Sequence, residues 1–218
     1  MVAKRKISTG KYLIAFVISA SIFTIGILIG NLMSNSKLNS IDNFQQKIRT
    51  QVLTLETQYL IAYQNPCNFI DFPELNEELY TLSDNLGDLE TDLGKNNKKV
   101  LELVEYYSLL EARHWLFLKD VSKKCGKNLN LILFFYSNDD NKCSDCSVQG
   151  YVLTNLRKKY PEENIYVYSF NVDLSNRVVN TLMNLYNVKK VPSLVINDKL
   201  YQGFKDRAEI EKILGLSS

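Results

Sequence analysis

The chain has 218 residues, of which 45% are hydrophobic and 23% are charged, a composition ordinary for one or two globular domains. Its 26 basic and 24 acidic side chains leave a formal net charge of only +2, with lysines interleaved among carboxylates throughout. That balance provides no basic surface for nucleic acid, so no nucleic-acid partner is expected. The four cysteines make an even number, which suits pairing in an oxidising compartment.

The N-terminal region contains an uncharged apolar segment at residues 12–33. It is long enough to span a bilayer, which takes roughly 20 apolar residues. Four basic residues lie in the stretch 1–11, whereas only Lys37 follows the segment closely. This asymmetry predicts a single-pass membrane protein with a cytoplasmic N-terminus and an extracytoplasmic C-terminal domain. A cleaved signal peptide has a similar basic start, but its apolar region is usually about 7 to 15 residues long, so an uncleaved anchor is favoured.

Residues 37–127 are predicted to form an all-α stalk or bundle. Apolar residues recur there at steps of three and four in three segments, which Asn65-Pro66 and Gly94 separate. The stripe positions are Ile41, Phe44, Ile48, Val52, Leu55, Tyr59 and Ala62; then Leu75, Leu79, Leu82, Leu86, Leu89 and Leu93; then Val100, Leu103, Val104, Tyr107, Leu110, Leu118 and Val121. Short turns between such helices favour an up-down-up arrangement.

In that arrangement Cys67 and Cys125, which follow the first and third helices, lie at the same pole. A disulfide between them is sterically plausible and is the prediction, although unpaired buried thiols are the alternative. By the chain-entropy model it would contribute about 4 kcal/mol.

From residue 129 the pattern changes to β-α-β-α-β-β-α. The strand-like runs are 129–137, 164–173, 192–197 and 200–204, and the helical runs begin after residue 146, near Ser175 as a cap, and at Asp206. Two consecutive β-α-β units predict right-handed crossovers and a parallel sheet. The last two strands flank Asp198-Lys199 and are expected to add an antiparallel hairpin at the edge.

Two short motifs lie at special places in this pattern. Cys143-Ser144-Asp145-Cys146 follows the first strand, and Val191-Pro192 comes directly before the third. Together they resemble the thioredoxin-like superfamily over residues 129–218. The resemblance implies a redox-active pair with Cys143 as nucleophile and Cys146 as resolving residue. It also implies a cis peptide bond at Pro192 and a substrate groove in which the backbone of Val191 binds an extended peptide.

The thiol chemistry would depend on the first helix of this domain. A helix N-terminus stabilises a thiolate, so Cys143 is expected there, more exposed than Cys146, which is expected three residues later on the same helix face. Lys142 should also favour the thiolate, whereas Asp145 should disfavour it.

The leading hypothesis is a membrane-anchored thiol–disulfide oxidoreductase acting on protein thiols and disulfides outside the cytoplasm, with an unidentified electron-transfer partner and no cofactor. In one variant, Cys67 and Cys125 relay electrons to the Cys143–Cys146 pair. The alternative is a non-catalytic interaction module with a structural Cys143–Cys146 disulfide. A metal site is not expected, because structural zinc usually needs four ligands and the chain has one CxxC and one histidine, His114, which is given no chemical role.

Overall fold

The computed structural model of the chain describes residues 9–69 and 73–216. The chain forms two compact units, residues 1–49 and 50–218. The long helix α1 (Thr9–Ala62) begins in the first unit and ends in the second.

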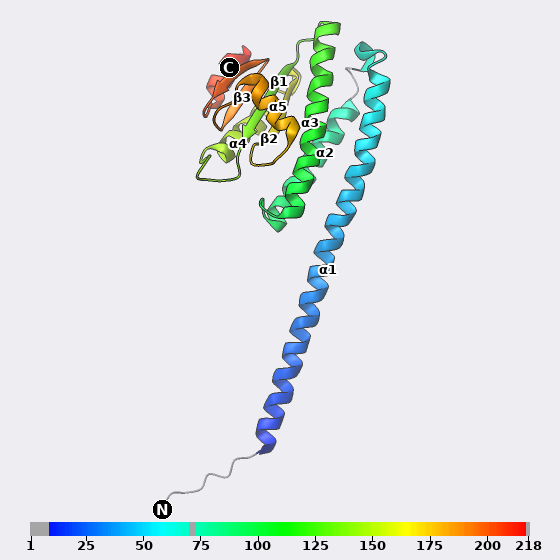
Figure 1. Cartoon of the computed structure of the whole chain (residues 1–218), viewed down its shortest axis with the longest axis vertical. Coiled ribbons are helices and arrows are strands. Elements are labelled where there is room, and N and C mark those ends of the chain that lie inside the picture. The colour runs from blue at the N-terminus through cyan, green and yellow to red at the C-terminus, as the bar shows by residue number, and fades with distance from the viewer. Residues whose placement is uncertain (1–8, 70–72, 217–218) are drawn as a thin grey trace, which may run out of the picture. The chain divides into compact units, whose positions relative to one another are not determined.

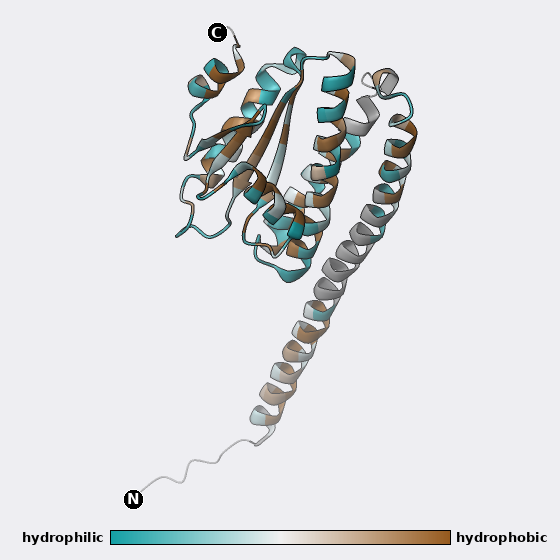
Figure 2. Ribbon diagram, turned by 45° about the horizontal axis from the view of Figure 1, so that its top comes forward, coloured by the Kyte–Doolittle hydropathy of each residue, from teal (hydrophilic) through white to brown (hydrophobic). Residues whose placement is uncertain are grey.

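The first unit contains an apolar helical segment, Tyr12–Asn31, that is long enough to cross a membrane. Its large apolar side chains are exposed around the helix rather than packed against protein. Figure 2 shows the hydrophobic colour along this part of α1. The hydroxyl groups of Ser21 and Thr24 donate to the carbonyls of Val17 and Ala20 in the preceding turn. These polar groups are therefore satisfied within the helix, as an apolar surrounding requires.

The helical part of the second unit contains the end of α1, the short helix η1 (Pro66–Phe69), α2 (Pro73–Leu93) and α3 (Lys98–Cys125). Most of the predicted apolar stripe is buried: Leu55, Tyr59, Ala62, Leu79, Leu82, Leu86, Val100, Leu103, Val104, Tyr107, Leu110, Leu118 and Val121. Leu89 and Leu93 are only half-buried, and α3 also buries Ala112, Trp115 and Phe117, which the predicted stripe did not include. The side chains of Ile41, Phe44, Ile48, Val52 and Leu75 lie outside the described residues.

Polar caps and glycines define where the helices end. At the start of α3, the side chain of Asn97 accepts a hydrogen bond from the backbone N–H of Lys99. Gly94 follows α2 with a φ of 90°, and Gly126 follows α3 with a φ of 65°. Glycine adopts this left-handed conformation without a Cβ clash, so α2 and α3 end where the sequence allows the chain to turn.

The second unit also contains a four-stranded mixed sheet in the order β2-β1-β3-β4 (Figure 1). The strands are β1 (Asn130–Tyr136), β2 (Ile165–Asn171), β3 (Ser193–Ile196) and β4 (Lys199–Gln202). The helices among them are α4 (Cys146–Lys159), η2 (Pro161–Glu163), α5 (Arg177–Tyr186) and α6 (Arg207–Leu214).

The direction of β3 differs from the prediction. β1 and β2 are parallel, but β3 pairs with β1 in the antiparallel sense, so the expectation of two parallel β-α-β units is wrong. An apolar run indicates that both faces of a strand are buried, and it does so equally for either direction of the chain. The register places Ser193, the first residue of β3, opposite Phe135 near the end of β1. The segment that precedes β3 therefore lies at the same end of the sheet as the loop that follows β1.

Two local predictions are also corrected. The N-cap of α5 is Asn176 rather than Ser175, because the Asn176 side chain accepts hydrogen bonds from the N–H groups of Val178 and Val179. The hairpin between β3 and β4 turns at Asn197-Asp198, one residue earlier than expected. Both turn residues have positive φ, which asparagine and aspartate tolerate better than most residues.

The α3 helix covers the edge strand β2. Glu111 accepts a hydrogen bond from the backbone N–H of Ser169 at 2.9 Å, and His114 contacts the hydroxyl group of Tyr168 at 2.9 Å. On α4, Arg157 lies over the ring of Tyr80 from α2, at 3.8 Å from the ring centroid. The α2–α3 hairpin is therefore packed against the sheet and α4, and protects a strand edge that would otherwise expose unpaired backbone groups.

Candidate functional site

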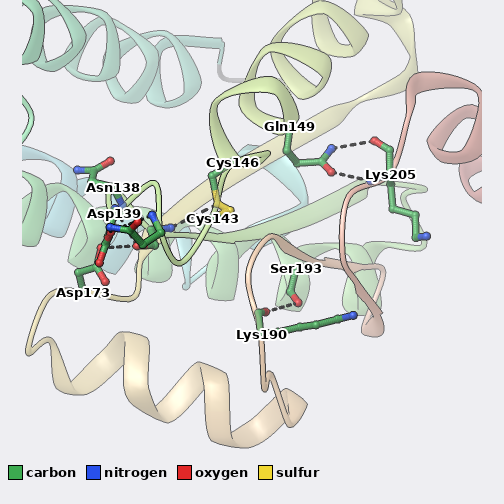
Figure 3. The surroundings of a disulfide bond; sticks show 11 residues. Asn138, Asp139, Cys143, Cys146, Gln149, Asp173, Lys190, Ser193 and Lys205 are labelled. Atoms are coloured by element: carbon green, nitrogen blue, oxygen red, sulfur yellow. Dashed lines mark hydrogen bonds between the residues drawn. A yellow bond between two sulfur atoms is a disulfide. The ribbon is translucent and has the colours of Figure 1, made fainter.

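Cys143 and Cys146 form a disulfide at the edge of the sheet where β1 ends, with their Cα atoms 5.4 Å apart (Figure 3). Cys146 is the first residue of α4, whereas Cys143 lies in the loop before that helix. The two residues are therefore not one turn apart on a single helix face, as the spacing suggested. They are also about equally buried, with exposed fractions of 6% and 5%, so the greater exposure expected for Cys143 is wrong for the disulfide form.

The sulfur of Cys146 receives a hydrogen bond from the backbone N–H of Ser137, at a distance of 3.5 Å. Ser137 directly follows β1, so the strand fixes the position of this donor. A backbone N–H and the N-terminal end of α4 both favour negative charge on a nearby sulfur. This end of β1 is therefore a place where a thiolate can be stabilised.

Asp173, which follows β2, anchors the loop that leads to Cys143. Its carboxylate accepts hydrogen bonds from the Ser137 hydroxyl at 2.7 Å and from the backbone N–H of Asn138 at 3.0 Å. Its other oxygen pairs with the Lys142 ammonium at 2.8 Å. Burial opposes the charged form, but the hydrogen bonds from Lys142 and Ser137 outweigh it and hold the pKa of Asp173 below its usual value.

This contact changes the expected role of Lys142. Its ammonium group is paired with Asp173 and its side chain is 58% exposed. The charge of Lys142 therefore stabilises the loop more directly than it stabilises a thiolate on either cysteine. Sequence reasoning missed Asp173 as a site residue. The available signal was its position at the end of the second parallel strand, because the ends of β1 and β2 meet at one edge of the sheet.

Val191 and Pro192 come immediately before β3, and the peptide bond between them is cis. Val191 packs against the hydrophobic cluster that contains Cys143 and Cys146. The carbonyl of Pro192 accepts a hydrogen bond from the N–H of Gly203 at 2.8 Å, which ties this segment to the residues after β4. The antiparallel direction of β3 thus brings the two sequence motifs to one site.

A buried glutamine, also missed from the sequence, supports the helix that carries Cys146. The side chain of Gln149 is fully buried and makes two hydrogen bonds with the backbone of Lys205, of 3.1 Å to the carbonyl and 2.8 Å from the N–H (Figure 3). These bonds join the first turn of α4 to the segment between β4 and α6. No local pattern in the sequence indicates this contact, because its partners are 56 residues apart.

A cavity of about 520 Å³ lies beside Cys146. The α2–α3 hairpin provides one wall, through Glu90, Lys95 and Asn96. The remaining lining residues come from β1, the loop after it, the start of α4 and β2: Phe134, Tyr136, Ser137, Asn138, Asp140, Cys146, Ser147, Gly150 and Ser169. Cys146 therefore borders a cavity that the helical hairpin partly encloses.

Cys67 in η1 and Cys125 at the end of α3 form the second disulfide. The end of α3 and the start of α4 lie at opposite ends of β1, a strand of seven residues that spans roughly 23 Å (Figure 1). Direct thiol exchange between the two pairs within one chain would require the sulfur atoms to touch. The structure therefore argues against the electron-relay variant.

His114 is buried in α3, and burial lowers its pKa to about 4. It lies eleven residues before Cys125 on α3 and contacts the hydroxyl group of Tyr168, so it is a packing residue. Within residues 9–69 and 73–216 there is no group of three or more His, Cys, Asp or Glu side chains that could hold a metal ion.

No protein-family model matches this chain, and no curated protein does. Among solved structures, one described as a malarial protein is 18% identical to the chain, with a TM-score of 0.34, and covers 40% of this chain and 96% of its own. A thioredoxin-2, described as a component of the malaria parasite protein secretion machinery, is 20% identical with a TM-score of 0.34, over 41% of this chain and 84% of its own. Likenesses at this level do not assign the chain to a family.

Proposed function

We propose that residues 129–218 form a thioredoxin-like domain and that the chain is a membrane-anchored thiol–disulfide oxidoreductase acting on protein disulfides. The observation that carries the proposal is the Cys143–Cys146 disulfide, formed where β1 ends and α4 begins. After reduction, the Ser137 N–H favours a thiolate on Cys146, and the N-terminal end of α4 favours a thiolate on a sulfur beside it. A thiolate is the nucleophile in both steps of disulfide exchange.

In the reducing direction, the Cys143 thiolate attacks one sulfur of a substrate disulfide. A bond forms between Cys143 and that sulfur, the substrate disulfide breaks, and the other substrate sulfur leaves as a thiolate. The Cys146 thiolate then attacks Cys143, forms the Cys143–Cys146 bond and releases the second substrate thiolate. Two electrons pass from the chain to the substrate, and the reverse sequence oxidises a substrate dithiol. A separate thiol or disulfide partner restores the starting state.

The segment before β3 is proposed to bind the substrate. Val191 packs against the hydrophobic cluster of the two cysteines, and its backbone would pair with an extended peptide. Pro192 has no N–H and a fixed φ, so it would define the shape of this groove.

The apolar segment Tyr12–Asn31 is proposed to anchor the chain in a membrane. The basic residues before it favour a cytoplasmic N-terminus and a domain outside the cytoplasm. Oxidation of all four cysteines in the structure is compatible with that compartment.

One observation favours a non-catalytic interaction module as the second candidate. Both cysteines of the disulfide are only about one-twentieth exposed, at 6% and 5%, so a substrate must gain access to a sulfur that is largely covered. In the module, the disulfide would stabilise the start of α4 and the neighbouring surface would bind a partner without exchange.

A turnover assay separates these candidates. The full chain in detergent micelles is added to insulin with dithiothreitol as the reductant, and insulin reduction is followed. The oxidoreductase is expected to accelerate reduction at least about tenfold over the reductant alone, and Cys143→Ser is expected to abolish the acceleration because the attacking thiolate is lost. Cys146→Ser is expected to accumulate a mixed disulfide between Cys143 and insulin, which peptide mass analysis detects.

Ser144→Ala is the matched control, because Ser144 is exposed between the two cysteines and carries no thiol. It is expected to keep wild-type turnover. Absence of acceleration by the wild-type chain, together with absence of a trapped species in Cys146→Ser, would reject the enzyme in favour of the module.

A further inference from the structure

A second cavity, of about 220 Å³, lies between the α2–α3 hairpin on one side and α4 and the sheet on the other. It shares Phe134, Gly150 and Ser169 with the cavity beside Cys146, but neither Cys143 nor Cys146 lines it. Pockets for drug-sized ligands usually measure about 300–1,000 Å³, so this one admits only a smaller molecule.

The hairpin side of this cavity contains a buried carboxyl group without a counter-charge. Glu111 of α3 is 2% exposed, and its Oε1 accepts a hydrogen bond from the Ser169 N–H at 2.9 Å. Its Oε2 is buried and has no hydrogen-bond partner in the part of the chain that the structure describes. The hydroxyl group of Tyr107 lies nearby but donates to the Leu79 carbonyl, at 3.3 Å. Buried polar atoms nearly always have a partner, so Oε2 indicates a donor that the chain itself does not supply.

The α4 side of the cavity contains a cation without a counter-charge. The guanidinium group of Arg157 lies 3.8 Å from the centroid of the Tyr80 ring. Among the described residues it forms no ion pair, either with Glu111 or with Asp84, the two carboxyl groups that line the same cavity. Tyr80 and Tyr107 are each close enough to both Glu111 and Arg157 for the two charges to act on them. One cavity therefore presents two opposite charges that do not neutralise each other.

We propose that this cavity binds a small zwitterion, a molecule with a protonated amine at one end and an anionic group such as a carboxylate at the other. The amine donates to Glu111 and the anion accepts from Arg157, so each charged group gains the partner that it lacks. The apolar side chains of Phe134, Leu153 and Val167 line the space between and contact the carbon atoms of the ligand. Water could hydrogen-bond to the polar groups, but it would gain nothing from these apolar walls. The inference does not depend on thiol exchange.

The charge state of Glu111 agrees with a missing cation. Burial raises the pKa of Glu111 well above its usual value, and the Ser169 N–H and the Tyr107 hydroxyl oppose the rise. Neither of these opposing groups is a cation. A bound ammonium group would favour the carboxylate, and the displaced proton would pass to the buffer. The other titratable or charged groups that face Glu111 or line the cavity are Tyr80, Asp84, Tyr136, Arg157 and Tyr168.

Titration of the full chain in detergent micelles tests the proposal. The zwitterionic probes are the ω-amino acids from glycine to 6-aminohexanoate, which hold the two charges at increasing separation. n-Butylamine and butanoate carry one charge each. Isothermal titration calorimetry measures affinity, and a rise in the thermal unfolding midpoint reports binding to the folded chain. At least one zwitterion is expected to bind at least about tenfold more tightly than either single-charge probe.

Two substitutions remove the two charges separately. Glu111→Gln keeps an acceptor for the Ser169 N–H but carries no charge, and Arg157→Gln changes a half-buried side chain outside the core. Each is expected to weaken the best zwitterion at least about tenfold. In Glu111→Gln the zwitterion should then bind no better than butanoate, and in Arg157→Gln no better than butylamine. Unfolding midpoints without probe show that the variants are folded.

Glu102→Gln and Lys158→Gln are the matched controls, because both residues are exposed, lie on α3 and α4, and do not line the cavity. They are expected to bind the zwitterion as the wild type does. Absence of binding of every zwitterion up to about 20 mM would overturn the proposal and leave a cavity that holds water only. Equal affinity for zwitterions and single-charge probes would also overturn it, as would equal losses of affinity in Glu111→Gln and Glu102→Gln.

Discussion

Two buried side chains of α3, Glu111 and His114, respond to pH in opposite ways. Burial raises the pKa of Glu111 well above its usual value, although the Ser169 N–H opposes the rise, so the folded chain favours the neutral acid. This contributes stability at low pH that is lost as the pH rises through the folded pKa. His114 has a folded pKa of about 4 and an unfolded pKa near 6.5, so its contribution is lost as the pH falls from about 6.5 to 4.

A His114→Asn variant isolates the histidine contribution. Asparagine keeps a polar group close to the position of Nδ1, which contacts Tyr168, but does not titrate. Between pH 7.5 and 5.0 the wild-type chain is expected to lose about 2 kcal/mol more unfolding free energy than the variant. Denaturant unfolding at the two pH values measures this difference, and the intrinsic effect of the substitution cancels. Equal losses in the two proteins would show that His114 is not buried as a neutral ring.

At the scale of elements, the sequence pattern predicted the kinds and order of the segments better than their directions. The apolar stripes of α2 and α3 have a helical period and β1 is a continuous apolar run, because one burial environment acts along each element. The direction of β3 is not encoded in such a run. It depends on how the chain from Asn187 to Pro192 returns to the sheet, which is a property of the packed domain.

Short sequence motifs predict only part of the candidate site. Cys143, Cys146, Val191 and Pro192 were predicted because short motifs occur at particular places in the element order. Gln149 and Asp173 were not, since each acts on residues at least 30 positions away. No periodicity or spacing in the chain indicates those contacts.

The N-terminus of α5 offers a direct test of one local correction. Asn176→Ala removes the side-chain oxygen that accepts from Val178 and Val179, and is expected to lower the unfolding free energy by about 1 kcal/mol. Ser175→Ala is the matched control, because Ser175 is exposed and precedes the cap by one residue; it is expected to change stability by less than about 0.5 kcal/mol. Thermal or denaturant unfolding compares the two. A larger loss of unfolding free energy in Ser175→Ala than in Asn176→Ala would show that Ser175 is the N-cap.

At the scale of the whole molecule, the two disulfides differ in role: one suits stabilisation of the fold and the other suits thiol exchange. Cys67–Cys125 closes a separation of 58 residues and joins η1 to the end of α3, within the helical part of the second unit. Cys143–Cys146 joins residues three positions apart, at the other end of β1, between a cavity and the segment before β3. A disulfide between distant residues lowers the conformational entropy of the unfolded chain more than one between near residues. Cys67–Cys125 is therefore expected to stabilise the fold more than Cys143–Cys146.

The proposed oxidoreductase requires a Cys143–Cys146 pair that cycles between disulfide and dithiol, and the reduction potential of this pair tests that requirement directly. The full chain in micelles would be equilibrated with graded glutathione or dithiothreitol buffers, and mass-resolved thiol trapping would follow each pair separately. We predict a potential between about −270 and −120 mV for Cys143–Cys146, the range of exchange-active couples. A value below about −300 mV would make the pair a structural disulfide and would contradict the oxidoreductase.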